Sequence, residues 1–116
     1  EGIAHAFNGS FEQANVYVNM GLHLGFGGTM TFERARQIRR LASDLPLSSL
    51  VIETDAPDIP PAWVNAGEHN YSYHLPRIAH TLAELRGLRH EVLAQSLWHN
   101  TLNALPRLVQ VLPADI

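Results

Sequence analysis

The sequence predicts an α/β domain with a parallel sheet, because short strand-like segments alternate with helical ones. Three apolar segments, residues 2–7, 22–26 and 50–54, have the composition of buried strands. Two helical segments, residues 11–20 and 32–44, separate them. Parallel strands need such crossover connections, and these are almost always right-handed. At 116 residues the chain is long enough for one domain with a hydrophobic core.

The two crossover helices have recognisable ends. Ser10 followed by Gln13 predicts a capping box at the start of the first helix, and Gly21 ends it. Gly27 and Gly28 break the second strand, after which Thr29 or Thr31 is expected to cap the helix over 32–44. The polar positions of that helix hold Arg34, Arg36, Arg39 and Arg40. We interpret these arginines as a solvated helix face, with a phosphate-binding patch as the alternative.

The third strand leads into the run Val51-Ile52-Glu53-Thr54-Asp55-Ala56-Pro57. One interpretation makes Asp55 a turn residue, because Asp before Ala-Pro is a common way to open a loop. The other places Glu53 and Asp55 on one face of the strand, so that two carboxylates stand at the mouth of a site. In parallel sheets, binding and catalysis take place at the carboxyl ends of the strands.

A long loop, residues 56–73, follows Asp55 and is rich in Pro, Asn and Gly. A loop of this length is usually functional or disordered, and its aromatic residues argue against disorder. We interpret it as a wall facing a substrate, whose rings either stack on bases or pack the loop down. Helices are then predicted over 75–86, with Gly87 as its stop, and over 89–105, with Trp98 and Leu102 on the buried face. No element is predicted for residues 109–116.

The composition excludes several classes of protein. No cysteine is present, which rules out disulfides and thiolate metal sites. No run approaches the roughly 20 apolar residues of a membrane span, so a soluble, cytoplasmic protein without a membrane partner is expected. Every basic residue is arginine and the formal net charge is −3, so the chain carries no evident basic patch for duplex DNA.

The chain has seven histidines, and their positions separate them into groups. His80, His90 and His99 fall within helices and are expected at the surface, His74 lies near a helix start, and His23 is expected to pack on a strand. His5 differs, because it lies near the end of the first strand, on the same rim as Asp55. Imidazole with carboxylate oxygen is a usual ligand set for zinc or manganese. The sequence therefore predicts His5 and Asp55 as two ligands of a metal ion.

Three motifs carry a resemblance to a known family. They are His5-Ala6-Phe7-Asn8-Gly9-Ser10, Leu24-Gly25-Phe26-Gly27-Gly28 and Ile52-Glu53-Thr54-Asp55-Ala56-Pro57, with Asn70 downstream. In order and spacing they resemble the C-terminal half of a TatD-type metal-dependent deoxyribonuclease, over residues 1–108, with 109–116 as a tail. The resemblance implies the C-terminal portion of a (β/α)8 barrel, with about three parallel strands plus helices. It also implies cleavage of phosphodiester bonds, usually in DNA, with one or two zinc, manganese or magnesium ions.

The same resemblance implies roles for individual residues. His5 corresponds to a metal-binding histidine, and Asp55 to an aspartate that binds metal and can take a proton from the attacking water. Glu53 corresponds to the preceding glutamate, with a catalytic role beside the ligands or on the phosphate side. Asn70 and His69 are expected to bind substrate. The family commonly has arginine where this chain has His69, and histidine lacks the two-pronged grip of a guanidinium on phosphate.

The length implies a further departure, because the family's first five strands and their metal ligands are absent from this chain. We therefore expect a missing N-terminal half as a partner, inactivity of the fragment alone, and self-association through an open sheet edge. Two alternatives to a deoxyribonuclease stay open at this point. One is a hydrolase of a small phosphoester, ester or amide, and the other is a non-catalytic module that self-associates.

Overall fold

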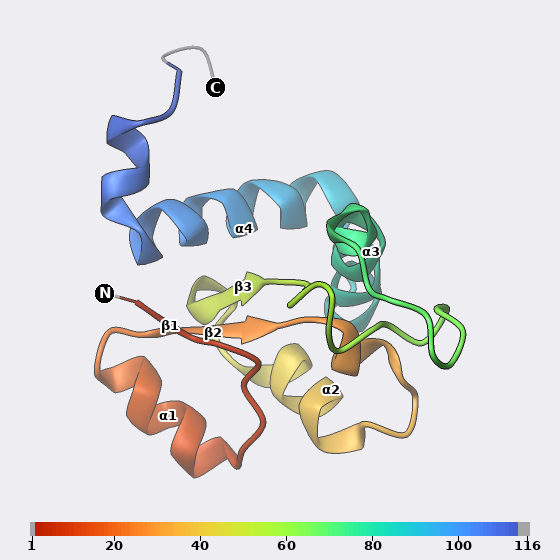
Figure 1. Ribbon diagram of the computed structural model, residues 1–116. Helices are drawn as coiled ribbons and strands as arrows, with labels where there is room; N and C mark the ends of the chain where they lie inside the picture. The colour runs from red at the N-terminus through yellow and green to blue at the C-terminus, as the bar shows by residue number, and fades with distance from the viewer. Residues whose placement is uncertain (1, 114–116) are drawn as a thin grey trace.

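The computed structural model describes residues 2–113 of the chain (Figure 1). Its sheet has three parallel strands in the order β1-β2-β3, which confirms the predicted α/β architecture. The strands are β1 (Ile3–Ala4), β2 (His23–Phe26) and β3 (Leu50–Ile52). In register, Ala4 lies opposite Leu24, and Phe26 lies opposite Ile52. All three carboxyl ends therefore meet at one edge of the sheet.

Within residues 2–113, four α-helices pack around the strands: α1 (Phe11–Asn19), α2 (Arg36–Asp44), α3 (Leu75–Arg86) and α4 (His90–Ala104). In Figure 1, α1 and α2 lie on one side of the strands and α4 on the other. Helix α1 packs against β2, α4 packs against β3, and α3 contacts both α2 and α4. Buried side chains of the strands and of all four helices form one core, including Leu24, Leu41, Ile78 and Leu93.

The helix ends show why these segments are helical. Ser10 accepts a hydrogen bond from the Gln13 amide while the Gln13 side chain accepts one from the Ser10 amide, so the predicted capping box is confirmed. Helix α3 has the predicted bounds, with proline in its first turn and Gly87 in the left-handed region at φ 65°. None of the helices in the described part of the chain is long and apolar enough to cross a membrane.

Helix α2 begins at Arg36, so the prediction that it starts at Phe32 was wrong. Residues Gly28–Thr31 form a short 3-10 helix instead. The Thr31 hydroxyl, expected as a possible helix cap, donates to the Gly28 carbonyl and accepts from the Ala62 amide at 2.8 Å. Its hydrogen bonds therefore fasten the long loop to this turn, and no side chain caps α2.

The buried face of α4 also differs from the prediction. Its buried residues are Leu93, Leu97, Asn100 and Ala104, whereas Trp98 is 38% exposed and Leu102 is half-buried. Asn100 takes part in this face because its amide nitrogen donates to the carbonyls of Leu47 and Leu50, each at 2.8 Å. A polar residue with such partners can lie in a buried stripe that a hydrophobic pattern does not reveal. Residues Pro106–Gln110 of the end region form a 3-10 helix, and 114–116 lie outside the described residues.

Candidate metal centre

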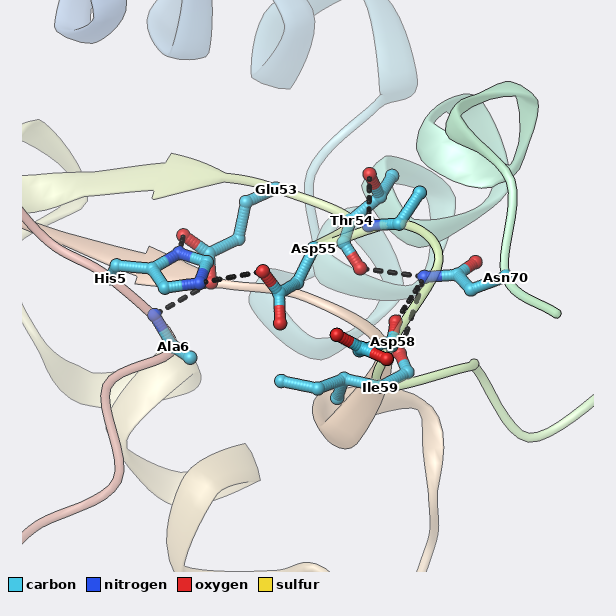
Figure 2. Close-up of polar contacts among 9 residues, drawn as sticks. His5, Ala6, Glu53, Thr54, Asp55, Asp58, Ile59 and Asn70 are labelled. Carbon is cyan, nitrogen blue, oxygen red and sulfur yellow. Dashed lines mark hydrogen bonds and ion pairs between the residues drawn. The ribbon is translucent and has the colours of Figure 1, made fainter.

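The imidazole of His5 joins two carboxylates at the carboxyl edge of the sheet (Figure 2). β1 ends at Ala4, and His5 lies in the turn that follows, 54% of its side chain exposed. Its Nδ1 lies 2.8 Å from Oε2 of Glu53, and its Nε2 lies 2.9 Å from Oδ1 of Asp55. Three residues singled out in the sequence are thus brought together from two strands separated by β2.

The two carboxylates do not share a face of a strand, as one interpretation of the sequence had it. β3 ends at Ile52, so Glu53 and Asp55 both follow it. Asp55 adopts φ 55°, the left-handed region, which aspartate tolerates better than most residues. The turn at Asp55, and not the two-residue repeat of a strand, therefore brings its carboxylate back toward His5.

Glu53 holds the turn after β1 in place. Its Oε1 accepts a hydrogen bond from the Ala6 amide at 2.6 Å, while Oε2 contacts the His5 ring. Ala6 itself has φ 48°, an unusual conformation for alanine that this bond helps to fix. The described contacts of the Glu53 carboxylate are therefore with this turn, and its predicted catalytic role stays a prediction.

Gly25 is part of the site, although the sequence did not single it out as a functional residue. It lies buried on β2 between the two outer strands, and a Cβ at this position would overlap Oε2 of Glu53. The missing side chain is therefore the space that the Glu53 carboxylate occupies. A glycine inside a strand often marks such a close approach, which is the signal that could have identified it.

The two carboxylates change the acidity of the imidazole. The hydrogen bond that the ring donates to Glu53 and the negative charge of that carboxylate are the main causes that raise the pKa of His5, with smaller contributions from Asp55. Partial burial opposes them by penalising the charged ring. The raised pKa means that, without a metal ion, the ring stays protonated to higher pH and can donate from both nitrogens.

The nitrogen and oxygen atoms at this edge are suitable ligands for a divalent ion, although they are few. Nitrogen and oxygen ligands lie about 2.0–2.2 Å from zinc, so Nε2 of His5 and Oδ1 of Asp55, 2.9 Å apart, fit the coordination sphere of one ion. Catalytic zinc usually has three protein ligands. Within residues 2–113, no group of three or more His, Cys, Asp or Glu side chains is placed to hold a metal ion.

The space beside these ligands is a cavity of about 190 Å³. It lies between the turns that follow the three strands, and its lining includes Ala6, Gly25, Gly27, Glu53 and Asp55. A Cβ at Gly27 would stand 2.7 Å from the Glu53 carbonyl oxygen, so glycine is needed for the backbones to approach. The cavity gives small groups access to the Asp55 carboxylate.

The long loop places the two predicted substrate-binding residues in different surroundings. His69 is exposed and lines an open hollow of about 480 Å³ with Ala56, Pro57, Asn70, Tyr71 and Ser72. Asn70 is only 1% exposed, and its amide nitrogen donates to backbone carbonyls of the loop (Figure 2). Substrate binding by either residue stays a prediction.

The other histidines lie away from the Asp55 carboxylate. His74 accepts a hydrogen bond from the Trp63 indole at 2.9 Å, and His80 pairs with Glu84 at 2.8 Å on the outer face of α3. His23 is half-buried, and desolvation lowers its pKa, in keeping with the expected packing role. Among the histidines, only His5 contacts Glu53 or Asp55 in the described residues.

Comparison with known proteins places the chain in a family. The model of one family, described as TatD related DNase, matches residues 1–106. The chain belongs to this family. This match covers nearly the whole chain and leaves only residues 107–116 outside it. It does not locate the chain within the family's barrel, so correspondence to the C-terminal half stays a prediction.

Individual TatD-related proteins are similar to this chain. A protein of Escherichia coli K12 named "Uncharacterized metal-dependent hydrolase YjjV" is 41% identical over 102 residues, which cover 86% of this chain and 38% of the relative. A protein of Haemophilus influenzae named "Uncharacterized metal-dependent hydrolase" is 37% identical over 85% of this chain and 37% of its own length. The chain therefore spans about two-fifths of the length of the curated relatives it matches.

Solved structures agree with the fold. The crystal structure of E. coli YjjV, described as a TatD homologue, superposes with a TM-score of 0.83 at 40% identity, over 89% of this chain and 39% of that one. A TatD-family hydrolase of Entamoeba histolytica gives a TM-score of 0.75 at 19% identity, covering 89% and 41%. At that identity the second likeness concerns the fold alone. The three parallel strands described above are thus arranged as in TatD-related proteins.

Proposed function

We propose that this chain is part of a metal-dependent hydrolase that cleaves phosphodiester bonds in DNA. The observation that carries the proposal is the contact of His5 with both Glu53 and Asp55 at the carboxyl edge of a TatD-related sheet. The names of the relatives as metal-dependent hydrolases support the coarser part, and the family description supports DNA as substrate. Zinc, manganese and magnesium are the candidate ions.

His5 and Asp55 would hold the ion, which supplies a bound water of lowered pKa and neutralises charge on the substrate. Nε2 of His5 binds metal only when it carries no proton, and Glu53 keeps the remaining ring proton on Nδ1. Glu53 thus orients the imidazole and makes Nε2 a stronger ligand for the metal ion. With only two ligands from this chain, we propose that the missing N-terminal half of the barrel supplies the others.

Asp55 has a second task in this proposal. Its Oδ1 faces His5, and no hydrogen bond from a described residue reaches its Oδ2. The side chain is 35% exposed and borders the cavity, so Oδ2 is accessible to a water molecule there. A carboxylate in this position can orient the attacking water and accept its proton.

The aromatic residues of the long loop support a nucleic-acid substrate. The rings of Tyr71 and Tyr73 stack with centroids 5.3 Å apart and planes 8° from parallel, and both are largely exposed. Tyr71 also borders the hollow that His69 lines. Exposed aromatic faces bind single-stranded nucleic acid by stacking on its bases, with little dependence on sequence.

A second candidate function is hydrolysis of a small phosphoester, ester or amide. His69 favours it, because an imidazole lacks the forked donors with which the family's usual arginine can bind a phosphate. A third is a non-catalytic module, which the small number of metal ligands on this chain favours. These candidates differ in metal dependence and in substrate.

The test is hydrolysis by the complete protein that carries this chain. Labelled single-stranded and duplex DNA, a small phosphodiester, an ester and an amide are each incubated with Mn²⁺, Mg²⁺ or Zn²⁺, with and without a chelator. We expect metal-dependent cleavage of DNA that Asp55→Asn abolishes and that Asp44→Asn, an exposed acid at the end of α2, leaves unchanged. Turnover of only the small substrates would favour the second candidate, and no turnover of any substrate would favour the third.

A further inference from the structure

We infer that Asn70 is a positioning residue that holds Asp55 in its ligand geometry, and that it is not a contact for substrate. The inference rests on the proposed function, because Asp55 matters there as a metal ligand. Asn70 follows Asp55 by 15 positions and is 1% exposed. Four backbone groups of the segment that contains Asp55 meet this one residue, as the following contacts show.

The side-chain amide of Asn70 donates hydrogen bonds to backbone carbonyls on both sides of Asp55 (Figure 2). Its Nδ2 lies 2.6 Å from the Thr54 carbonyl oxygen, 2.9 Å from that of Asp58 and 3.4 Å from that of Ile59. Its backbone amide donates to the Pro57 carbonyl at 3.0 Å. Thr54 precedes Asp55 and the other three follow it, so Asn70 fixes the turn from both sides.

Asp55 depends on such support because its backbone is strained. At φ 55° it lies in the left-handed region, which disfavours L residues, although aspartate less than most. Two local hydrogen bonds are described at the turn, from the Asp58 amide to the Asp55 carbonyl at 2.8 Å and from the Ala56 amide to the Thr54 hydroxyl at 3.3 Å. A residue held in a strained conformation keeps it only when its surroundings fix it, and here Asn70 supplies most of the described contacts.

The nitrogen of the Asn70 amide, and not its oxygen, carries this function. An atom that lies against carbonyl oxygens must be a donor, which assigns Nδ2 to this position. Oδ1 is buried and has no hydrogen-bond partner among residues 2–113. An unpaired buried acceptor costs free energy, so Oδ1 does not stabilise the turn. The hydrogen bonds donated by Nδ2 are therefore what stabilises it.

Burial also argues against direct binding of substrate. Nδ2 is committed to the loop backbone, and Oδ1 is covered by the protein. The hollow beside Asn70 is lined by exposed neighbours, among them His69 and Tyr71. Asn70 also borders that hollow, but it is only 1% exposed, so the exposed side chains of His69 and Tyr71 offer a substrate there far more surface.

Asn100 provides a matched control elsewhere in the fold. It is also buried, at 4% exposure, and its Nδ2 also donates to two backbone carbonyls, those of Leu47 and Leu50. Leu50 begins β3 and Leu47 lies in the 3-10 turn just before it, at the end of the strand opposite the metal centre. Asn→Asp at either position keeps the shape and replaces a donor with an acceptor that repels the carbonyls.

The first experiment compares Asn70→Asp and Asn100→Asp in the 116-residue chain without metal, by amide hydrogen exchange. The Asp58 amide reports on the Asp55 turn. The Ser49 amide, which donates to the Pro46 carbonyl, reports on the segment between the two carbonyls that Asn100 binds. We expect Asn70→Asp to speed exchange at Asp58 at least tenfold more than at Ser49, and Asn100→Asp to do the reverse. Equal exchange at Asp58 in wild type and Asn70→Asp would overturn the inference. Amides of the α3 core report whether each variant is folded, and Asn70→Ala replaces Asn70→Asp if the latter is not.

The second experiment measures the Mn²⁺ concentration for half-maximal activity in the complete protein. Partners that orient metal ligands typically contribute 10–100-fold to metal affinity, so we expect at least a tenfold increase in Asn70→Asp. Asn100→Asp should stay near wild type although it is also destabilised. The same increase in both variants would reduce Asn70 to a purely structural residue and overturn the inference. If wild type shows no Mn²⁺-dependent activity, the proposed function fails, while hydrogen exchange still decides whether Asn70 holds the turn.

Discussion

In the proposed metal centre, a proton and a metal ion would compete for Nε2 of His5. Glu53 and Asp55 favour the protonated ring, and the same Asp55 oxygen is placed to share a metal ion with that nitrogen. Loss of the ring proton is therefore required for metal to bind. Above the raised pKa of His5 the ring is neutral, and the Glu53 bond keeps its remaining proton away from the metal side.

The first prediction concerns stability against pH without metal. Because the pKa of His5 is raised in the fold, its contribution to the free energy of unfolding is fully present below its ordinary value of 6.5. It is lost as the pH rises through the raised pKa.

Urea unfolding of wild type and His5→Gln at several pH values between about 6 and 9 measures the effect. We expect wild type to lose more stability than the variant as the pH rises from 6 to 9. His90→Gln, at the exposed start of α4, controls for the loss of any histidine. Parallel curves for wild type and His5→Gln would show that the His5 contacts contribute nothing to stability.

The second prediction concerns the space at Gly25. In Gly25→Ala the new methyl group takes the place of Oε2 of Glu53, whose flexible side chain can move away. We expect the fold to be kept, a loss of about 1–3 kcal/mol in the free energy of unfolding, and a fall in the pKa of His5 toward its ordinary value. NMR titration of the His5 ring measures that fall.

Glu53→Gln is the comparison for Gly25→Ala, because it removes the charge without adding a methyl group. If Gly25→Ala acts through Glu53, the double variant should lower the pKa of His5 by less than the sum of the two single changes. An unchanged pKa in Gly25→Ala would mean that the carboxylate finds another route to the ring.

At the scale of elements, the sequence predicted most clearly what local chemistry decides. The bounds of α3 follow from proline in its first turn and Gly87 at its end, and the start of α1 follows from the Ser10 capping box. The start of α2 was not predictable in this way, because Thr31 is engaged by the distant Ala62 amide. His5 and Asp55 could be selected from strand-end positions, whereas the burial of Asn70 depends on a loop fold without any sequence periodicity.

The third prediction tests the capping box. Ser10→Ala removes the acceptor for the Gln13 amide and should lower the free energy of unfolding by about 1 kcal/mol. Ser10→Asp keeps an acceptor and should stay near wild type. Urea denaturation measures both variants, and equal losses in the two would show that the side chain at this position does not cap α1 in solution.

For the molecule as a whole, the chain combines two proposed metal ligands with exposed apolar surface. β1 pairs only with β2 in the described sheet, and Ile3 on it is 36% exposed. On neighbouring α1, Val16 is 57% exposed and Met20 is 65% exposed. A strand as short as β1 limits pairing with another chain, so the self-association expected from the sequence should depend mainly on apolar side chains.

The last prediction joins the metal site to the length of the chain. We propose two metal ligands on this chain, His5 and Asp55, whereas catalytic zinc commonly has three, and the chain spans 38% of the E. coli YjjV sequence. We expect the 116-residue chain alone to bind Mn²⁺ weakly and to hydrolyse no DNA. A chimera in which residues 1–106 replace the matching segment of YjjV should bind Mn²⁺ at least tenfold more tightly, because the remaining strands complete the coordination.

Calorimetric titration of chain and chimera measures this difference, with Asp55→Asn expected to remove the gain and Asp44→Asn to keep it. Equal affinity in chain and chimera, with both proteins folded, would mean that this segment does not share its metal with the rest of a barrel.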